Sequence, residues 1–182
     1  KWERICKIAQ PNIFKNKKVL DIGCSDGYFS IKACAYANKV VGIDLDNLRI
    51  QRANFIKSVL EVKNCDFQLG SIDTLDVKKF DLTLALGILH RVPDPINFLK
   101  GITSISNELI IEYKCLKSPQ NIAYFGGAKT KLNKFNKLYF LFTPNCLKSI
   151  LDTFGFKILS KEKLPIFNKL KYPRHIIYCK RE

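Results

Sequence analysis

A short apolar segment followed by two closely spaced glycines constrains the fold of this chain more than any other feature. Residues 18–22 read Lys-Val-Leu-Asp-Ile, which is typical of a buried β-strand, and Gly23 and Gly27 come directly after it. Glycines at the end of a first strand let a ligand approach the backbone with no Cβ in the way. A tight turn from strand to helix that binds nothing needs the same residues, so the glycine pair alone leaves both interpretations open.

Short apolar runs alternate with amphipathic segments along the rest of the chain, which is the pattern of an open parallel sheet covered by helices. Further strands are predicted at residues 39–44, 64–69, 80–86 and 108–113. Helices are predicted at about 28–37, 46–60 and 95–101. No internal repeat or low-complexity linker is visible, so we expect a single domain over residues 1–182.

Helix starts are marked by Asp46 and Asp94, which are good N-caps, the second followed by Pro95 at the first helical position. The helix after Asp46 is predicted to be amphipathic. Its apolar residues near one face are Leu48, Phe55, Ile56, Val59 and Leu60.

Residues 114–142 interrupt this rhythm with Gly126-Gly127, many lysines and several aromatic residues. We expect this segment to be an insertion or a lid over the carboxyl edge of the sheet. Thr143 and Pro144 then begin another helix, which Gly155 ends. Residues 156–160 and 175–180 are predicted to form a final antiparallel pair.

The positive charge is concentrated at one end of the chain. Of the net +15, residues 1–113 contribute +3 and residues 114–182 contribute +12. Lysines that alternate with aromatics in residues 114–142 would suit an RNA loop, because lysine neutralises phosphates and aromatic rings stack on unpaired bases. The alternative is an amphipathic lid with solvated lysines. Further cations are predicted in a loop between the last two strands, at Lys161, Lys163, Lys169, Lys171 and Arg174.

An acid after the second strand favours a nucleoside ligand over an empty turn. Asp44 ends that strand, where a carboxylate hydrogen-bonds the ribose hydroxyls of an adenosine cofactor. The spacing Gly23-x-x-x-Gly27 differs from the GxGxxG of dinucleotide sites, which disfavours an NAD-dependent oxidoreductase. Asp21 and Asp26 would repel a diphosphate and suit a cation. S-adenosylmethionine is such a ligand, since it carries an ammonium and a sulfonium and no phosphate.

Three motifs in order resemble those of class I S-adenosylmethionine-dependent methyltransferases: Asp21-x-Gly23-x-x-x-Gly27, residues 41–46 and residues 80–87. The resemblance implies a Rossmann-like α/β fold with a seven-stranded, mostly parallel sheet, an antiparallel C-terminal strand and helices on both faces. It implies that Asp44 holds the ribose and that Leu45 packs on the adenine. Such enzymes often carry an acid where Ser71 stands. The implied cofactor-binding residues are Asp21, Gly23, Cys24, Ser25, Gly27, Tyr28, Asp44, Leu45, Ser71, Ile72, Leu86 and Gly87.

Residues 86–91, and the later segment 137–144, are similar to the group of methyl- and carboxymethyltransferases that modify the wobble uridine of tRNA. Those enzymes often have a tyrosine where His90 stands, and it helps to hold a carboxylated cofactor, so the sequence favours transfer of a plain methyl group. His90 and Arg91 are the predicted catalytic residues. His90 could act as a general base, since the unperturbed pKa of histidine is near about 6.5, or be a structural residue at a helix entry. Arg91 could bind a substrate phosphate, or be solvated.

The sequence therefore predicts a methyltransferase that uses S-adenosylmethionine on a small molecule or an RNA base, with tRNA as a candidate. The alternative is a catalytically degenerate module that binds nucleic acid or serves as a scaffold.

The seven cysteines form no CxxC pair, which disfavours a disulfide framework or a metal site and fits a reducing compartment. With no long apolar run and no signal peptide visible, we expect a cytoplasmic protein without a membrane span.

Overall fold

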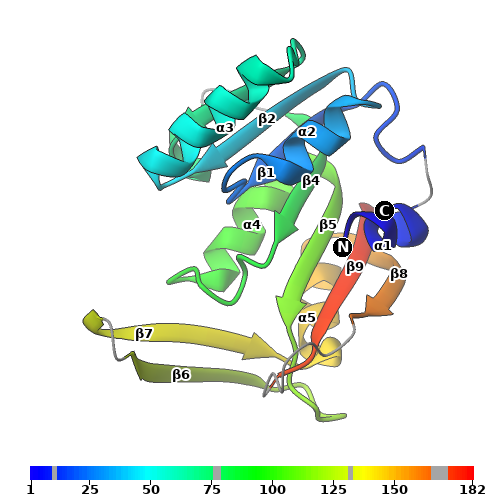
Figure 1. Ribbon diagram of the computed structural model, residues 1–182. Coiled ribbons are helices and arrows are strands. Elements are labelled where there is room, and N and C mark those ends of the chain that lie inside the picture. Colours follow the sequence, from blue (N-terminus) through cyan, green and yellow to red (C-terminus); the bar gives the residue numbers. More distant parts are fainter. Residues whose placement is uncertain (10–11, 76–78, 131–132, 165–171) are drawn as a thin grey trace.

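A seven-stranded sheet forms the centre of the computed structural model, which describes residues 1–9, 12–75, 79–130, 133–164 and 172–182 (Figure 1). The strand order is β3-β2-β1-β4-β5-β9-β8. All strands run parallel except β9, which is antiparallel to both of its neighbours. The predicted fold class is therefore confirmed. The strands are β1 (Lys18–Ile22), β2 (Lys39–Asp44), β3 (Cys65–Leu69), β4 (Phe80–Leu86), β5 (Ser106–Lys114), β8 (Phe156–Lys163) and β9 (Arg174–Arg181).

Helices cover both faces of the sheet, and each face has its own hydrophobic core. One core joins the sheet to α1 (Trp2–Ala9), α2 (Tyr28–Cys34) and α3 (Asn47–Val59). The other joins it to α4 (Pro95–Ile105) and α5 (Pro144–Thr153). Alternate strand residues divide between them: Val19 packs in the first core and Leu20 in the second, as the two-residue period of a strand requires. No helix in the described part of the chain is long and apolar enough to cross a membrane.

Local capping signals account for most helix boundaries. Asp46, Asp94 and Thr143 each accept a hydrogen bond from a backbone N–H of the first turn, as predicted. Gly155, with φ +74°, follows the end of α5. The predicted end of α4 near Gly101 is wrong, since the helix continues to Ile105. The fully buried Ile102 packs in the core beneath it, and this packing outweighs the low helix propensity of glycine.

The predicted apolar face of α3 is not the face that packs on the sheet. Ile50 and Ala53 are its buried residues. Four of the five predicted residues are instead more than half exposed: Leu48, Phe55, Val59 and Leu60. Because α3 covers the sheet near its β3 edge, a narrow contact through small and branched side chains is enough to hold it.

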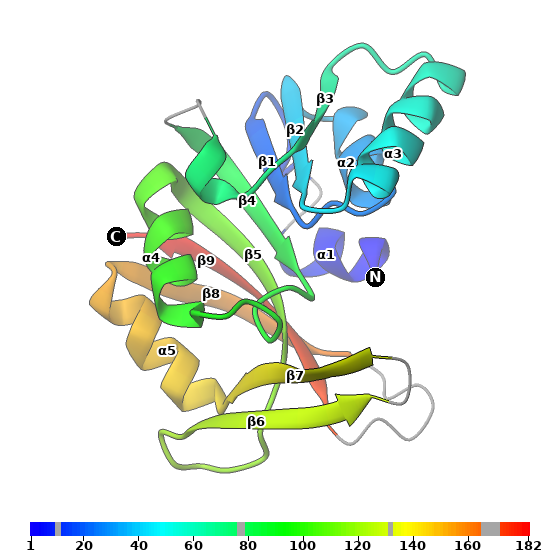
Figure 2. The same cartoon turned by 90° about the vertical axis from the view of Figure 1, so that its left-hand side faces the viewer.

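Residues 114–142 contain a hairpin outside the main sheet, formed by β6 (Ala123–Thr130) and β7 (Asn133–Phe142). It extends away beyond the carboxyl ends of β4 and β5 in both views (Figures 1 and 2). An isolated bridge between Cys115 and Phe142 connects it to the end of β5. The hairpin thus lies outside the main sheet, and the interpretation of the segment as an insertion or a lid stays a prediction.

The basic loop predicted between the last two strands is in part strand. Lys161 and Lys163 lie on β8 and Arg174 begins β9, because the antiparallel pair extends further than residues 156–160 and 175–180. Lys169 and Lys171 fall outside the described residues. All seven cysteines are free thiols, five of them buried.

Candidate functional site

The loop between β1 and α2 has a backbone that only glycine accommodates at two positions. Gly23 and Gly27 have φ +69° and +84°. A Cβ on Gly23 would lie 2.9 Å from Ile88 Cδ1, and one on Gly27 would lie 2.6 Å from Phe67 Cζ. Gly23 therefore lets Ile88, a residue that sequence reasoning did not include in the site, pack closely against the loop backbone. Gly27 permits close packing of α2 against β3.

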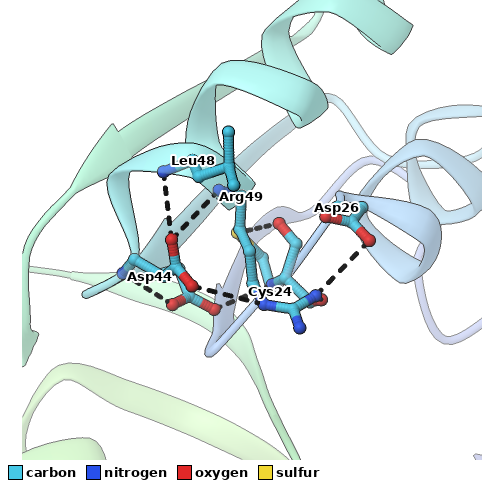
Figure 3. A network of polar contacts seen from close by, with 7 residues as sticks. Cys24, Asp26, Asp44, Leu48 and Arg49 are labelled. Carbon is cyan, nitrogen blue, oxygen red and sulfur yellow. Dashed lines mark hydrogen bonds and ion pairs between the residues drawn. The ribbon is translucent and has the colours of Figure 1, made fainter.

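Asp44, at the end of β2, has its carboxylate fixed by two backbone donors (Figure 3). Ser25 N–H donates to Oδ2 at 2.9 Å, and Asp46 N–H donates to Oδ1 at 3.0 Å. Each oxygen keeps a lone pair for another donor, as a ribose hydroxyl would require. Next to it, the side chain of Leu45 is 78% exposed, which leaves an apolar surface beside the acid. The predicted contacts of Asp44 with a ribose and of Leu45 with an adenine stay a prediction.

Asp21 lies beneath the loop rather than on its surface. It is 2% exposed and accepts a hydrogen bond from Ser30 Oγ at 2.6 Å. Burial and, to a smaller extent, the negative charge of Asp44 raise the pKa of Asp21 to about 6, although hydrogen bonds from Ser30 act in the opposite direction. A cationic ligand above the loop would offset both effects.

The pKa of Asp21 predicts a pH-dependent stability. Because folding raises this pKa from 3.8 to about 6, the protonated acid is favoured in the folded state, and stability falls as the pH rises from about 4 to about 6. Asp21→Asn should therefore become progressively more stable than the wild type over that interval, by about 3 kcal/mol at pH 7. Urea unfolding of both proteins from pH 4 to 7 measures this difference. A difference that does not vary with pH would show that Asp21 titrates normally.

The remaining predicted residues of the loop and of β3 have mixed placements. Cys24 is buried, so only its backbone faces the loop, and burial raises the pKa of its thiol. Tyr28 is exposed at the start of α2. Ser71 caps the short 3₁₀ helix Ile72–Thr74 through its own hydroxyl, which accepts from Asp73 N–H at 3.2 Å. Contacts of Ser71 and Ile72 with an adenine stay a prediction.

His90 follows β4 in a turn and is 3% exposed. Neither ring nitrogen has a hydrogen-bond partner among the described residues. Burial, together with the positive charges of Lys114, Arg174, Arg91 and Lys1, lowers the pKa of His90 to about 3. The pKa of His90 thus lies well below the unperturbed value of 6.5, so the imidazole is neutral at pH 7, and its action as a general base stays a prediction. Arg91 is exposed beside it.

Cations that sequence reasoning did not group surround this turn. Glu112 is fully buried on β5, directly opposite Leu86 on β4. Arg174 Nη1 donates to its Oε1 at 2.6 Å, and Lys1 Nζ lies 2.8 Å from its Oε2. A Cβ on Gly87, with φ +79°, would lie 3.3 Å from Arg174 Nη1, so glycine lets this ion pair approach β4. We call Lys1, Arg91, Lys114 and Arg174 the cation cluster.

The residues present fit S-adenosylmethionine. The loop after β1 lies between β2, which ends in Asp44 beside the exposed Leu45, and the carboxyl end of β4. The acids around it suit a sulfonium and an ammonium, and a phosphate would be repelled. Within the described ranges, no group of three or more His, Cys, Asp or Glu is placed to hold a metal ion.

Comparisons with known proteins agree with this geometry. The family described as "Methyltransferase domain" matches residues 13–167. A protein named tRNA U34 carboxymethyltransferase from Nautilia profundicola is 32% identical over 86% of this chain and 54% of its own length. One of the same name from Helicobacter pylori is 28% identical over 86% of this chain and 61% of its own length. The chain thus spans little more than half of these relatives.

Solved structures share the fold at low identity. A putative S-adenosylmethionine-dependent methyltransferase from Listeria monocytogenes has a TM-score of 0.80 at 16% identity, over 100% of this chain and 97% of that one. Magnesium protoporphyrin IX methyltransferase from Synechocystis, with bound S-adenosylmethionine, has a TM-score of 0.75 at 19% identity, over 99% and 77%. With its family match and its glycine loop, this chain belongs to the class I S-adenosylmethionine-dependent methyltransferases.

Proposed function

We propose that this protein transfers a methyl group from S-adenosylmethionine to a base of tRNA in the cytoplasm. The observation that carries the proposal is the cation cluster. Its side chains come from the residue before α1, from the turn after β4, from the end of β5 and from the start of β9, and they gather where the transferred group is expected. Two of these cations pair with the buried Glu112, so four cations and one carboxylate leave a net positive site, which suits a polyanion.

The names of the relatives support tRNA as the substrate and uridine 34 as the acceptor. Both are tRNA U34 carboxymethyltransferases. The excess of positive charge in residues 114–182 points to the same class of partner.

Within this proposal, the chain's residues position the acceptor rather than activate it strongly. S-adenosylmethionine supplies a methyl group that is already electrophilic on its sulfonium, so alignment of the acceptor contributes much of the rate. His90, neutral at pH 7, is a weak base that can still accept a hydrogen bond from an N–H or O–H group of the acceptor base. Arg91 is exposed and would contact a phosphate of the substrate.

Carboxymethyl transfer is the second candidate. The unpartnered nitrogens of buried His90 and the surrounding cation cluster would suit a transferred group that itself carries a carboxylate. The names of the relatives favour the same reaction.

The test uses tRNA from cells that lack the U34 modification, incubated with the protein and either S-adenosylmethionine or its carboxylated form. Mass spectrometry of the digested nucleosides identifies the added group. We expect a methyl group on uridine 34, while a carboxymethyl group would establish the second candidate. Binding of S-adenosylhomocysteine and tRNA without transfer would instead support the alternative, a catalytically degenerate module that binds nucleic acid. Transfer to other acceptors alone would overturn tRNA as substrate.

The hairpin predicts a contribution to RNA affinity. Phe125 and Phe140 pair across the strands with ring centroids 4.8 Å apart, and Tyr124 and Tyr139 lie 6.2 Å apart. Tyr124 and Phe125 are 46% and 56% exposed, so part of each ring can stack on an unpaired base.

Replacing Tyr124 by leucine should therefore weaken tRNA binding by about tenfold, the scale of one lost base stack, and leave S-adenosylhomocysteine binding unchanged. Filter binding at fixed salt measures the first affinity and calorimetry the second. Tyr36→Leu, at an equally exposed tyrosine after α2, is the matched control. Equal RNA affinity of both variants would assign the hairpin rings to packing alone.

A further inference from the structure

Arg49, in the first turn of α3, reaches back across the glycine loop, residues 23–27 between β1 and α2 (Figure 3). Its Nη1 donates to Ser25 Oγ at 2.6 Å and lies 3.4 Å from Asp26 Oδ2. Its Nε lies 3.7 Å from Asp46 Oδ2. One guanidinium thus joins the loop after β1 to the N-terminus of the helix after β2.

The partner of this contact, Ser25, has an unfavourable backbone conformation. Its φ of +54° lies in the left-handed region, where a side chain with a Cβ costs free energy unless its surroundings hold it. Two hydrogen bonds hold Ser25, one through its backbone and one through its side chain. Its backbone N–H donates to Asp44 Oδ2, and its hydroxyl accepts from Arg49.

The same two contacts orient the acid of the ribose site. Because Ser25 N–H fixes one oxygen of Asp44, any movement of Ser25 changes the direction in which that carboxylate points. Arg49 also places a positive charge between Asp26 and Asp46, and so offsets the repulsion between these two carboxylates.

We infer that Arg49 is a positioning residue for the cofactor site, which acts through Ser25 to keep the loop and Asp44 in their binding geometry. A surface ion pair alone would not do this, because exposed pairs contribute little. The hydrogen bond to a strained loop residue gives Arg49 its effect. The inference concerns the cofactor site and does not depend on which acceptor is used.

The first test measures S-adenosylhomocysteine affinity by calorimetry in Arg49→Met, which keeps the alkyl stem and removes the guanidinium. We expect a loss of about tenfold, the scale of a hydrogen bond to a charged group. Ser25→Ala, which removes the hydroxyl and keeps the strain, should reproduce this loss. Arg52→Met, at an exposed arginine on the same helix, is the control and should bind like the wild type.

A double-mutant cycle separates action through Ser25 from direct contact with the ligand. Glycine at position 25 removes both the hydroxyl and the strain, so adding Arg49→Met to Ser25→Gly should change affinity by no more than about twofold. A full loss in that background would mean that Arg49 meets the ligand itself and would overturn the inference. A lowered melting temperature of Arg49→Met with unchanged affinity would also overturn it, since Arg49 would then be merely structural.

In turnover assays with any accepted substrate, the same variant should raise the KM for S-adenosylmethionine and change kcat much less. A fall in kcat at unchanged KM would contradict a role in cofactor positioning. Because affinity for S-adenosylhomocysteine is measured without RNA, failure of the tRNA proposal would leave this test intact.

Discussion

Gly27→Ala is expected to lower the free energy of unfolding by about 2–5 kcal/mol, because two penalties act at one position. The first is backbone strain, since φ is +84° and an L-residue with a Cβ is disfavoured there. The second is a clash, since the new Cβ would lie 2.6 Å from Phe67 Cζ and 3.2 Å from Ala53 Cβ. The aromatic ring is packed between α2, α3 and the sheet, so it cannot move without disturbing the core.

Gly155→Ala is the matched control for this prediction. Gly155 has a similar φ of +74°, but a Cβ there would meet nothing within 4 Å. Backbone strain alone should therefore lower the free energy of unfolding of Gly155→Ala, by about 1–2 kcal/mol. Urea denaturation of the wild type and both variants gives the difference. Equal losses would mean that Phe67 yields freely and that the packing at Gly27 contributes nothing.

Asp44→Ala is expected to weaken binding of S-adenosylhomocysteine by about 1–3 kcal/mol, the scale of a lost charge-assisted hydrogen bond. The substitution removes the acceptor for a ribose hydroxyl. It also releases the N–H groups of Ser25 and Asp46, so the loop loses one of the two contacts that hold Ser25. Calorimetric titration measures the affinity, with NADH as a parallel ligand that should not bind.

Asp66→Ala provides the comparison for Asp44→Ala. Asp66 is a half-exposed acid on β3 that pairs with Lys39, away from the loop. Its removal should leave the affinity unchanged. Unchanged affinity of a folded Asp44→Ala protein would refute the assigned cofactor site.

The parallel strands and the glycine loop could be predicted because their signals are local. The apolar run before Gly23 and the acid that ends β2 lie within a short stretch of chain, and β1 and β2 bring them to one edge of the sheet. The N-caps Asp46 and Asp94 are equally local, since each bonds to the turn that it begins. Such features need no knowledge of the tertiary fold.

The cation cluster and the orientation of α3 could not be predicted, since both depend on long-range packing. Lys1, Lys114 and Arg174 come from distant parts of the chain and meet only because β9 pairs with β5, with Lys114 directly opposite Arg174. In α3, Phe55 is exposed and Ala53 is buried, which contradicts the apolar face predicted from the sequence. The position of the helix over the sheet edge determines which side of the helix is buried. The hydrophobic periodicity of the sequence carries no information on that position. Glu112 did carry a signal, as an acid that directly follows the apolar residues 109–111 of β5.

The place of β9 in the sheet has a consequence for how the protein is made. β9 follows β8 in the chain, yet it lies inside the sheet between β5 and β8. During synthesis, both of those strands keep an open edge until residues 174–181 leave the ribosome, and open edges are templates for aggregation. A chain that ends before Arg174 would lack the strand that joins β5 to β8, and it would also lack one residue of the cation cluster. Premature termination should therefore yield insoluble protein rather than a soluble, partly active enzyme.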